Sequence, residues 1–187
     1  MKFSMKKVTV LLADGFEEIE ALTVVDLLRR AKVYVDTVSI TDDYTVRGAH
    51  GIPVQTEDLI TEIDFKESDM IVLPGGMPGT TNLKEDENVR KAVQEAYDDG
   101  RYVAAICAAP TILADMGLLK GKRATCYPDM ESEIEDAYLT GAPVATDGNI
   151  ITSQGVGTAI DFALKLIEVL ISEEKAVEIA DSIVYQR

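Results

Sequence analysis

One of the two cysteines lies where a buried strand would turn directly into a helix. Cys107 follows the apolar run 102–106 and is followed at once by Ala108, Ala109 and Pro110. A sharp strand-to-helix corner of small residues lifts a side chain out of the sheet, as in a nucleophile elbow. Because a helix N-terminus favours thiolate over thiol, we expect a lowered thiol pKa and a nucleophilic role. The alternative is a buried, inert cysteine, a common fate of this residue.

Three carboxylates stand at the entrance of the first expected helix. Glu17 and Glu18 fall where acidic side chains stabilise a helix N-terminus, and this structural role is enough to explain these two of the three carboxylates. Glu20 lies further in and shares a face with Glu17 rather than with Glu18. If its side chain points over the end of the sheet, burial raises its pKa, and a protonated carboxyl can hydrogen-bond a thiolate and exchange protons with a substrate. We therefore predict Glu20 as the acid–base partner of Cys107.

Glycine-rich turns follow two other apolar runs. Gly75 and Gly76 come directly after Pro74, where glycines let backbone N–H groups turn toward a ligand, as in an oxyanion hole. An ordinary tight turn explains the same pair equally well. The turn at 155–158 resembles half a dinucleotide fingerprint, but Ile160 stands where the third glycine belongs. We predict an oxyanion site at the first turn and no nucleotide site at the second.

The elements that must position these residues alternate along the chain. Apolar runs of strand length are separated by segments with helical spacing, which is typical of a mostly parallel sheet with helices on both faces. In such α/β sheets, sites form beyond the carboxyl ends of the strands, where the candidate residues fall. We expect strands over 7–13, 34–40, 69–73, 102–106, 123–127, 144–146 and 149–153, helices over 18–31, 88–99, 109–116 and 157–170 with a short helix after the last, and short strands or a hairpin within 42–57.

Composition and charge restrict the function classes. The chain has 187 residues, 47% of them hydrophobic, and a net charge of −15 without a basic stripe, so we expect a globular protein that binds no nucleic acid. No apolar run reaches the roughly 18 residues of a membrane helix. The basic start resembles a signal peptide, but Asp14, Glu17 and Glu18 follow where a cleavage site should be, so we expect a cytoplasmic protein. With Cys107, Cys126 and one histidine, we predict no structural disulfide and no metal.

Four segments stand in a distinctive order and spacing: ADGFEEIE at 13–20, VLPGG at 72–76, AICAAP at 105–110 and ITSQGVGT at 151–158. Together they resemble the ThiJ/PfpI superfamily, and most closely its Parkinsonism-associated protein deglycase branch. The resemblance runs from about Lys7 to the end of the chain. It implies a single class I glutamine amidotransferase-like domain over 1–187, with a flavodoxin-like three-layer α/β sandwich, and a homodimer.

The resemblance also implies roles for individual residues. Cys107 would be the nucleophile and Glu20 its protonated partner, while Gly75, Gly76 and the Ala108 backbone would line an anion pocket. The further candidates for substrate binding are Glu17, His50, Tyr127 and Gly155. The implied activity acts on small reactive carbonyls without a cofactor. It is either conversion of methylglyoxal to lactate without glutathione, as in glyoxalase III, or repair of glycated amines and thiols.

Three positions depart from the family's pattern. Ala108 stands where protease-like members place a histidine after the nucleophile, which disfavours peptidase activity. Tyr127 stands where the deglycase branch often places a histidine, and a phenol with a pKa near 10 is a poor base at neutral pH. Glu20 would then be the only evident acid–base group. Gln154 replaces an arginine, so less positive charge would meet an anionic substrate.

Several alternatives stay open. Cys107 could act as a redox sensor that is oxidised to a sulfinate stabilised by Glu20, or the chain could be a holdase chaperone, which its acidic surface permits. His50 lies in a turn-rich segment that the resemblance places near the pocket and the dimer interface, but a solvated loop histidine is the simpler interpretation. Cys126 is either a resolving thiol near Cys107 or a packed strand cysteine.

Overall fold

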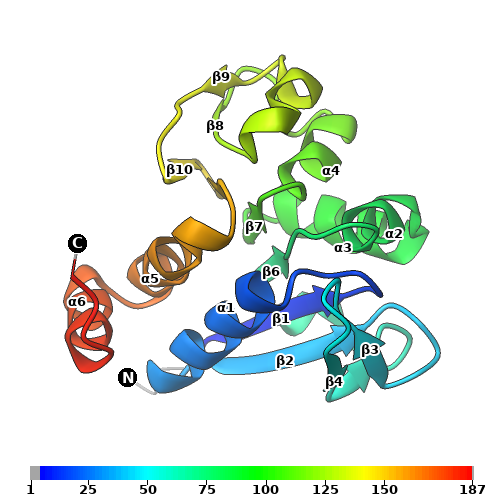
Figure 1. Ribbon diagram of the computed structural model, residues 1–187, viewed down its shortest axis with the longest axis horizontal. Coiled ribbons are helices and arrows are strands. Elements are labelled where there is room, and N and C mark those ends of the chain that lie inside the picture. The colour runs from blue at the N-terminus through cyan, green and yellow to red at the C-terminus, as the bar shows by residue number, and fades with distance from the viewer. Residues whose placement is uncertain (1–4, 187) are drawn as a thin grey trace.

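The structure is a computed structural model that describes residues 5–186. Its centre is a seven-stranded sheet with the order β10–β11–β7–β6–β1–β2–β5 (Figure 1). All neighbouring strands are parallel except β10 and β11. The predicted mostly parallel sheet is therefore confirmed. Its strands are β1 (Lys7–Leu12), β2 (Tyr34–Ser39), β5 (Asp58–Leu59), β6 (Met70–Leu73), β7 (Tyr102–Ile106), β10 (Val144–Asp147) and β11 (Ile150–Ser153).

Helices cover both faces of this sheet and complete the predicted three-layer sandwich (Figure 1). Along β1, Val8 and Val10 pack with α1, α5 and α6 on one face, whereas Leu11 packs with α2, α3 and α4 on the other. This alternation follows from the two-residue period of a strand. Val8, Val10, Leu11 and Leu12 are all buried because both faces of β1 are covered. The helices are α1 (Glu18–Arg30), α2 (Gly79–Glu85), α3 (Glu87–Asp98), α4 (Pro110–Asp115), α5 (Ala159–Leu170) and α6 (Glu173–Ser182).

Shorter elements lie outside the central sheet. The predicted hairpin within 42–57 is formed by β3 (Thr45–Arg47) and β4 (Pro53–Gln55), which pair antiparallel. A second small sheet joins β8 (Arg123–Ala124) to β9 (Tyr138–Leu139). The 3₁₀ turns are η1 (Phe65–Glu67), η2 (Pro128–Ile134) and η3 (Val156–Thr158).

The structure corrects two expectations about these elements. The predicted strand over 123–127 is wrong beyond its first two residues, because the Tyr127 N–H donates to the Cys107 carbonyl at 2.8 Å instead of to a strand. Pro128 then begins η2. The sequence did not predict α2, because its start at Gly79 follows a turn rich in glycine and proline.

The topology brings four loops together. β11, β7, β6 and β1 are parallel neighbours, so their carboxyl ends lie side by side at one edge of the sheet. The segments that follow these strands carry Gly155, Cys107, Gly75 and Glu17 respectively. Between residues 5 and 186, the structure contains no helix with the length and apolar character needed to span a bilayer.

Candidate active site

Cys107 occupies the corner between β7 and α4. Its φ angle is +64°, in the left-handed region that non-glycine residues rarely adopt. The Cys107 N–H donates to the Ser153 carbonyl on β11 at 3.0 Å, and its carbonyl accepts from Tyr127. These two backbone hydrogen bonds hold the strained corner, which has the geometry predicted for a nucleophile elbow. Sequence reasoning missed Ser153, although it belongs to one of the four recognised segments.

Glu20 is completely buried on the first turn of α1. Its Oε2 accepts a hydrogen bond from the Gly75 N–H at 2.9 Å, while Oε1 is buried without a well-formed hydrogen bond. Burial raises the pKa of Glu20 to about 7, against the hydrogen bonds from Cys107 and Gly75, which lower it, and with a small increase from the Glu17 charge. The predicted burial and raised pKa of Glu20 are therefore confirmed.

The Cys107 thiol is half-buried beside this carboxyl. Burial, the Glu20 charge and the hydrogen bond to Glu20 raise the pKa of Cys107 to about 12, while backbone hydrogen bonds from Ala108 and Gly76 lower it. The predicted lowering of the thiol pKa is therefore wrong, because burial and the neighbouring Glu20 carboxylate outweigh the backbone donors. A proton on Glu20 removes the charge repulsion and lets the carboxyl donate to the sulfur.

The four loops meet around the sulfur. A Cβ at Gly155 would lie 3.7 Å from Tyr127 Cδ2, 3.9 Å from Cys107 Sγ and 3.9 Å from Glu20 Oε1. A Cβ at Gly75 would lie only 2.6 Å from both Cys107 Cβ and Glu20 Oε2, so that position requires glycine. The structure therefore brings Tyr127, Gly155, Cys107 and Glu20 into one site.

The two neighbouring glycines after β6, Gly75 and Gly76, make different contacts. The Gly75 N–H is bound by Glu20, whereas the Gly76 N–H faces the Cys107 sulfur together with that of Ala108. The Gly75 carbonyl also accepts the Glu17 N–H at 2.9 Å, which ties the start of α1 to this turn. Of the donors that the sequence proposed for an anion, Gly76 and Ala108 are the two that point to the Cys107 sulfur.

The remaining candidates lie around this centre. Glu17 caps α1, accepting the Glu20 N–H through Oε2 at 2.8 Å. His50 has a side chain that is 70% exposed, and its Nδ1 lies 2.9 Å from Glu18 Oε2. The hydrogen bond with Glu18 raises the pKa of His50, so the solvated-loop interpretation missed a specific partner. Cys126 is buried with Sγ 3.3 Å from the Tyr127 carbonyl, and burial raises its pKa to about 11, which fits the packed cysteine.

Fold and site together define a class of α/β sandwich proteins built around a cysteine on a strand-to-helix corner and a buried, protonatable glutamate. A sequence profile described as the DJ-1/PfpI family matches residues 6–169. The chain belongs to the DJ-1/PfpI family.

Curated relatives support this assignment along nearly the whole chain. Protein DJ-1 homolog B of Arabidopsis thaliana is 40% identical over 186 residues, which cover 98% of this chain but only 42% of that protein. Protein dj-1beta of Drosophila melanogaster is 36% identical over 177 residues, which cover 94% of this chain and 95% of that protein. A Schizosaccharomyces pombe protein named glutathione-independent glyoxalase DJ-1 is 33% identical, with 91% and 94% covered.

Solved structures match the fold closely. Drosophila melanogaster DJ-1beta superimposes with a TM-score of 0.94 at 34% identity and covers 98% of this chain and 100% of that chain. An oxidized Toxoplasma gondii DJ-1 gives a TM-score of 0.92 at 36% identity, with 97% and 100% covered. The predicted fold class and the sequence resemblance are both confirmed.

Proposed function

We propose that this protein is a cysteine-dependent enzyme that converts small α-oxoaldehydes such as methylglyoxal to hydroxy acids without glutathione. The observation that carries the proposal is the buried Glu20 carboxyl, with a pKa near 7, beside the half-buried Cys107 thiol. A group that titrates near neutral pH can both donate and accept a proton during turnover. The name of the S. pombe relative, glutathione-independent glyoxalase DJ-1, supports the same class of reaction.

In the first step, the Cys107 sulfur attacks the aldehyde carbon of the substrate and forms a hemithioacetal. The carbonyl π electrons move to oxygen, and the Gly76 and Ala108 N–H groups, which point to the sulfur, would stabilise that oxyanion. Glu20 holds the proton that the thiol gives up and passes a proton to the oxyanion. No general base other than Glu20 is needed for this step.

In the second step, Glu20 transfers the proton of the former aldehyde carbon to the ketone oxygen, which gives an enediol. It then transfers the hydroxyl proton of the former aldehyde carbon to the former ketone carbon. The product of this transfer is a thioester between Cys107 and the hydroxy acid. Water then hydrolyses the thioester, which releases the acid and restores the thiol. The net change is the addition of one water molecule, so no cofactor is consumed.

The surroundings favour a small substrate. The Tyr127 ring is partly exposed next to Gly155, at the mouth of the site, where its hydroxyl can hydrogen-bond a substrate oxygen. Hydrolytic removal of a glyoxal adduct from an amine or thiol, the deglycase reaction, would use the same nucleophile and acid. We place it second because it must admit a larger partner.

The test is methylglyoxal consumption by the purified protein without glutathione, with lactate measured as the product. Cys107→Ser and Glu20→Gln are expected to abolish turnover, since the first removes the nucleophile and the second keeps the shape of the carboxyl but cannot exchange protons. Cys126→Ser, which changes the buried thiol, is the matched control and should retain turnover.

Turnover by Cys107→Ser at the wild-type rate would contradict the proposal outright. Loss of activity in Cys107→Ser but full activity in Glu20→Gln would keep the nucleophile and reject the acid–base assignment.

A candidate function of a different class is redox sensing, favoured by the contact of the Cys107 sulfur with two backbone donors and one carboxyl. Each of two peroxide molecules would transfer one oxygen atom to sulfur and leave as water, giving a sulfinate whose oxygens face Gly76, Ala108 and protonated Glu20. The similar Toxoplasma gondii structure is described as oxidized. Mass spectrometry after mild peroxide should find Cys107 oxidised before Cys126. The opposite order would reject this candidate.

We further propose a homodimer, as the family resemblance implies. Ile19 and Leu22 of α1 and Ile52 of the hairpin loop are large apolar side chains left exposed on the described chain. Ile52 and α1 are neighbours, because the Ile52 N–H lies 3.4 Å from Glu18 Oε1. Sedimentation velocity should give twice the chain mass, and a monomer at micromolar concentration would contradict the assembly.

A further inference from the structure

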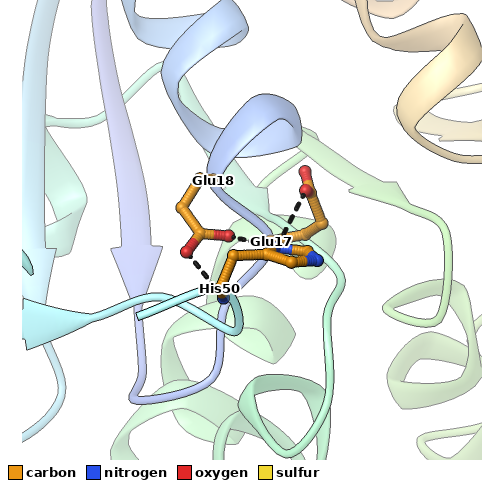
Figure 2. A group of neighbouring side chains, drawn as sticks. All are labelled: Glu17, Glu18 and His50. Atoms are coloured by element: carbon orange, nitrogen blue, oxygen red, sulfur yellow. Dashed lines mark hydrogen bonds and ion pairs between the residues drawn. The ribbon is translucent and has the colours of Figure 1, made fainter. Parts of the chain in front are cut away.

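Three side chains with metal-ligating atoms converge outside the Cys107 site, at the start of α1. Glu17 and Glu18 come from the helix entrance, and His50 comes from the loop of the β3–β4 hairpin (Figure 2). One ligand atom from each lies within 4.8 Å of the other two. His50 is also held by its backbone, because its N–H donates to Glu18 Oε1 at 2.8 Å. The hairpin loop and the helix entrance are therefore fixed against each other.

The distances suit a small cation. His50 Nδ1 lies 2.9 Å from Glu18 Oε2 and 3.7 Å from Glu17 Oε1. Two ligands of a tetrahedral zinc ion, each at its usual bond length, are separated by about 3.3 Å. The two separations from His50 fall on either side of this value, and all three ligand atoms lie within 4.8 Å of one another, so side-chain adjustments would bring them around one ion.

Glu17 supplies an independent reason to expect a cation. Its side chain is only 10% exposed, and its Oε2 is used by the helix cap. Its Oε1 has His50 Nδ1 as a charged neighbour, at 3.7 Å. A cation beside a largely buried carboxylate offsets the desolvation cost of its charge. The side chain of Glu18 is 5% exposed, so two buried carboxylates share this place.

We propose that Glu17, Glu18 and His50 bind a divalent transition-metal ion of the zinc class. An imidazole nitrogen with two carboxylate oxygens suits Zn²⁺, Co²⁺, Ni²⁺ or Cu²⁺, whereas Mg²⁺ and Ca²⁺ prefer oxygen ligands alone. The net charge of −15 on the chain attracts cations to the surface around the site. Three protein ligands leave a fourth position for water or a small ligand.

The site is separate from the thiol in its residues, since neither Cys107 nor Glu20 belongs to it. It also departs from the sequence expectation of no metal, which considered the lone histidine and the cysteines without nearby carboxylates. The structure supplies those carboxylates by folding the hairpin loop back onto the helix entrance. The hydrogen bond between His50 Nδ1 and Glu18 Oε2 would be exchanged for two bonds to the ion.

The experiment titrates Zn²⁺ into the Cys107→Ser protein by calorimetry, and Co²⁺ by its visible absorption, so that the reactive thiol cannot supply a ligand. We expect one ion per chain. His50→Ala, Glu17→Gln and Glu18→Gln should each weaken binding by about tenfold or more, since loss of even an outer-sphere partner commonly costs that much. Both glutamine variants keep an oxygen that can accept the existing backbone hydrogen bonds, so the local fold should survive.

Glu173→Gln is the matched control, because Glu173 is an exposed first-turn glutamate of α6 away from any histidine of the described chain. It should bind Zn²⁺ like the parent protein. Parent-like affinity in His50→Ala, or the absence of saturable binding by the parent protein, would overturn the proposal. Thermal unfolding without metal identifies any variant that fails to fold, and the remaining two ligand variants then decide the result.

Discussion

Two glycines around the Cys107 sulfur leave very different room for a side chain. At Gly155 an added Cβ meets its neighbours at 3.7–3.9 Å, which is ordinary van der Waals contact. At Gly75 it would approach Cys107 Cβ and Glu20 Oε2 at 2.6 Å. The backbone at Gly155 is extended, with a φ of 163°, so alanine is also tolerated there by the chain itself. The same substitution therefore tests access at one position and packing at the other.

Gly155→Ala should fold with little change in stability but lower kcat/KM for methylglyoxal by roughly 10-fold to 100-fold, because the methyl group occupies the space through which substrate reaches the sulfur. Gly75→Ala should instead lose about 1–3 kcal/mol of unfolding free energy through overpacking. Urea unfolding and steady-state kinetics on both variants measure the difference. Wild-type kcat/KM in Gly155→Ala would show that substrate approaches from elsewhere.

The pKa of Glu20 also predicts how stability depends on pH. The folded carboxyl keeps its proton up to about pH 7, whereas its ordinary pKa is 4.5. Because the pKa of Glu20 is raised in the fold, its contribution to the free energy of unfolding is fully present below pH 4.5 and is lost as the pH rises through 7. The pKa difference between the folded and unfolded states corresponds to roughly 3 kcal/mol of that free energy. The Glu20→Gln variant should not show this pH-dependent loss of stability, because glutamine does not titrate.

Urea unfolding of the wild type and Glu20→Gln at pH 5 and pH 8 isolates this contribution, because other groups titrate equally in both proteins. The wild type should lose up to about 3 kcal/mol relative to the variant between these pH values. An equal pH dependence in the two proteins would mean that Glu20 is ionised in the fold at pH 5.

At the scale of the elements, helix caps offer a comparison between a site helix and an ordinary one. Glu17 caps α1 through the Glu20 N–H, and Asp86 caps α3 through the N–H groups of Asn88 and Val89. Both caps satisfy donors that would otherwise be left unpaired at a helix start. Only the first lies next to the acid that we assign to the reaction.

Glu17→Ala and Asp86→Ala should each lose about 1 kcal/mol of stability with their caps. Asp86→Ala should leave methylglyoxal turnover unchanged. Glu17→Gln keeps an acceptor oxygen but removes the charge that helps to raise the pKa of Glu20, so the pH midpoint of kcat/KM should move to lower pH. A midpoint that moves upward or not at all would remove Glu17 from the electrostatics of the site.

At the scale of the whole molecule, the two apolar layers hold the site at the sheet edge. Phe162 of α5 is completely buried in the apolar cluster shared by α1, α5 and α6. The thiol sits at the end of β7, whose Ala104 and Ile106 pack in the same cluster. Loss of this layer would therefore loosen the corner that carries Cys107.

Phe162→Ala should destabilise the protein by about 3–5 kcal/mol, because it removes a large buried ring and leaves a cavity. Val177→Ala, on the exposed side of α6, is the control and should change stability by less than about 0.5 kcal/mol. Urea unfolding measures both. A loss below 1 kcal/mol in Phe162→Ala would mean that this layer can collapse around the missing ring.

Much of the fold could be predicted because the signals are local. The apolar runs of β1, β6 and β7 have the length and composition of buried strands, and those of β1 and β6 are ended by polar or glycine-rich residues. The corner at Cys107 was likewise evident from small residues on both sides. The strand expected at 123–127 is wrong beyond its first two residues because the Tyr127 N–H donates to the Cys107 carbonyl. No local sequence pattern indicates such a hydrogen bond between positions distant in the chain.

The sequence by itself determined which residue types stand at the strand ends, and therefore the family and the candidate nucleophile and acid. Only the tertiary structure decided how they act on one another. The Glu20–Gly75 hydrogen bond joins positions 55 apart, and the His50–Glu18 pair joins positions 32 apart. Burial and charge at such contacts set the pKa of Cys107 upward, against the sequence expectation, because desolvation and Coulomb energy depend on distances in space and not on spacing along the chain.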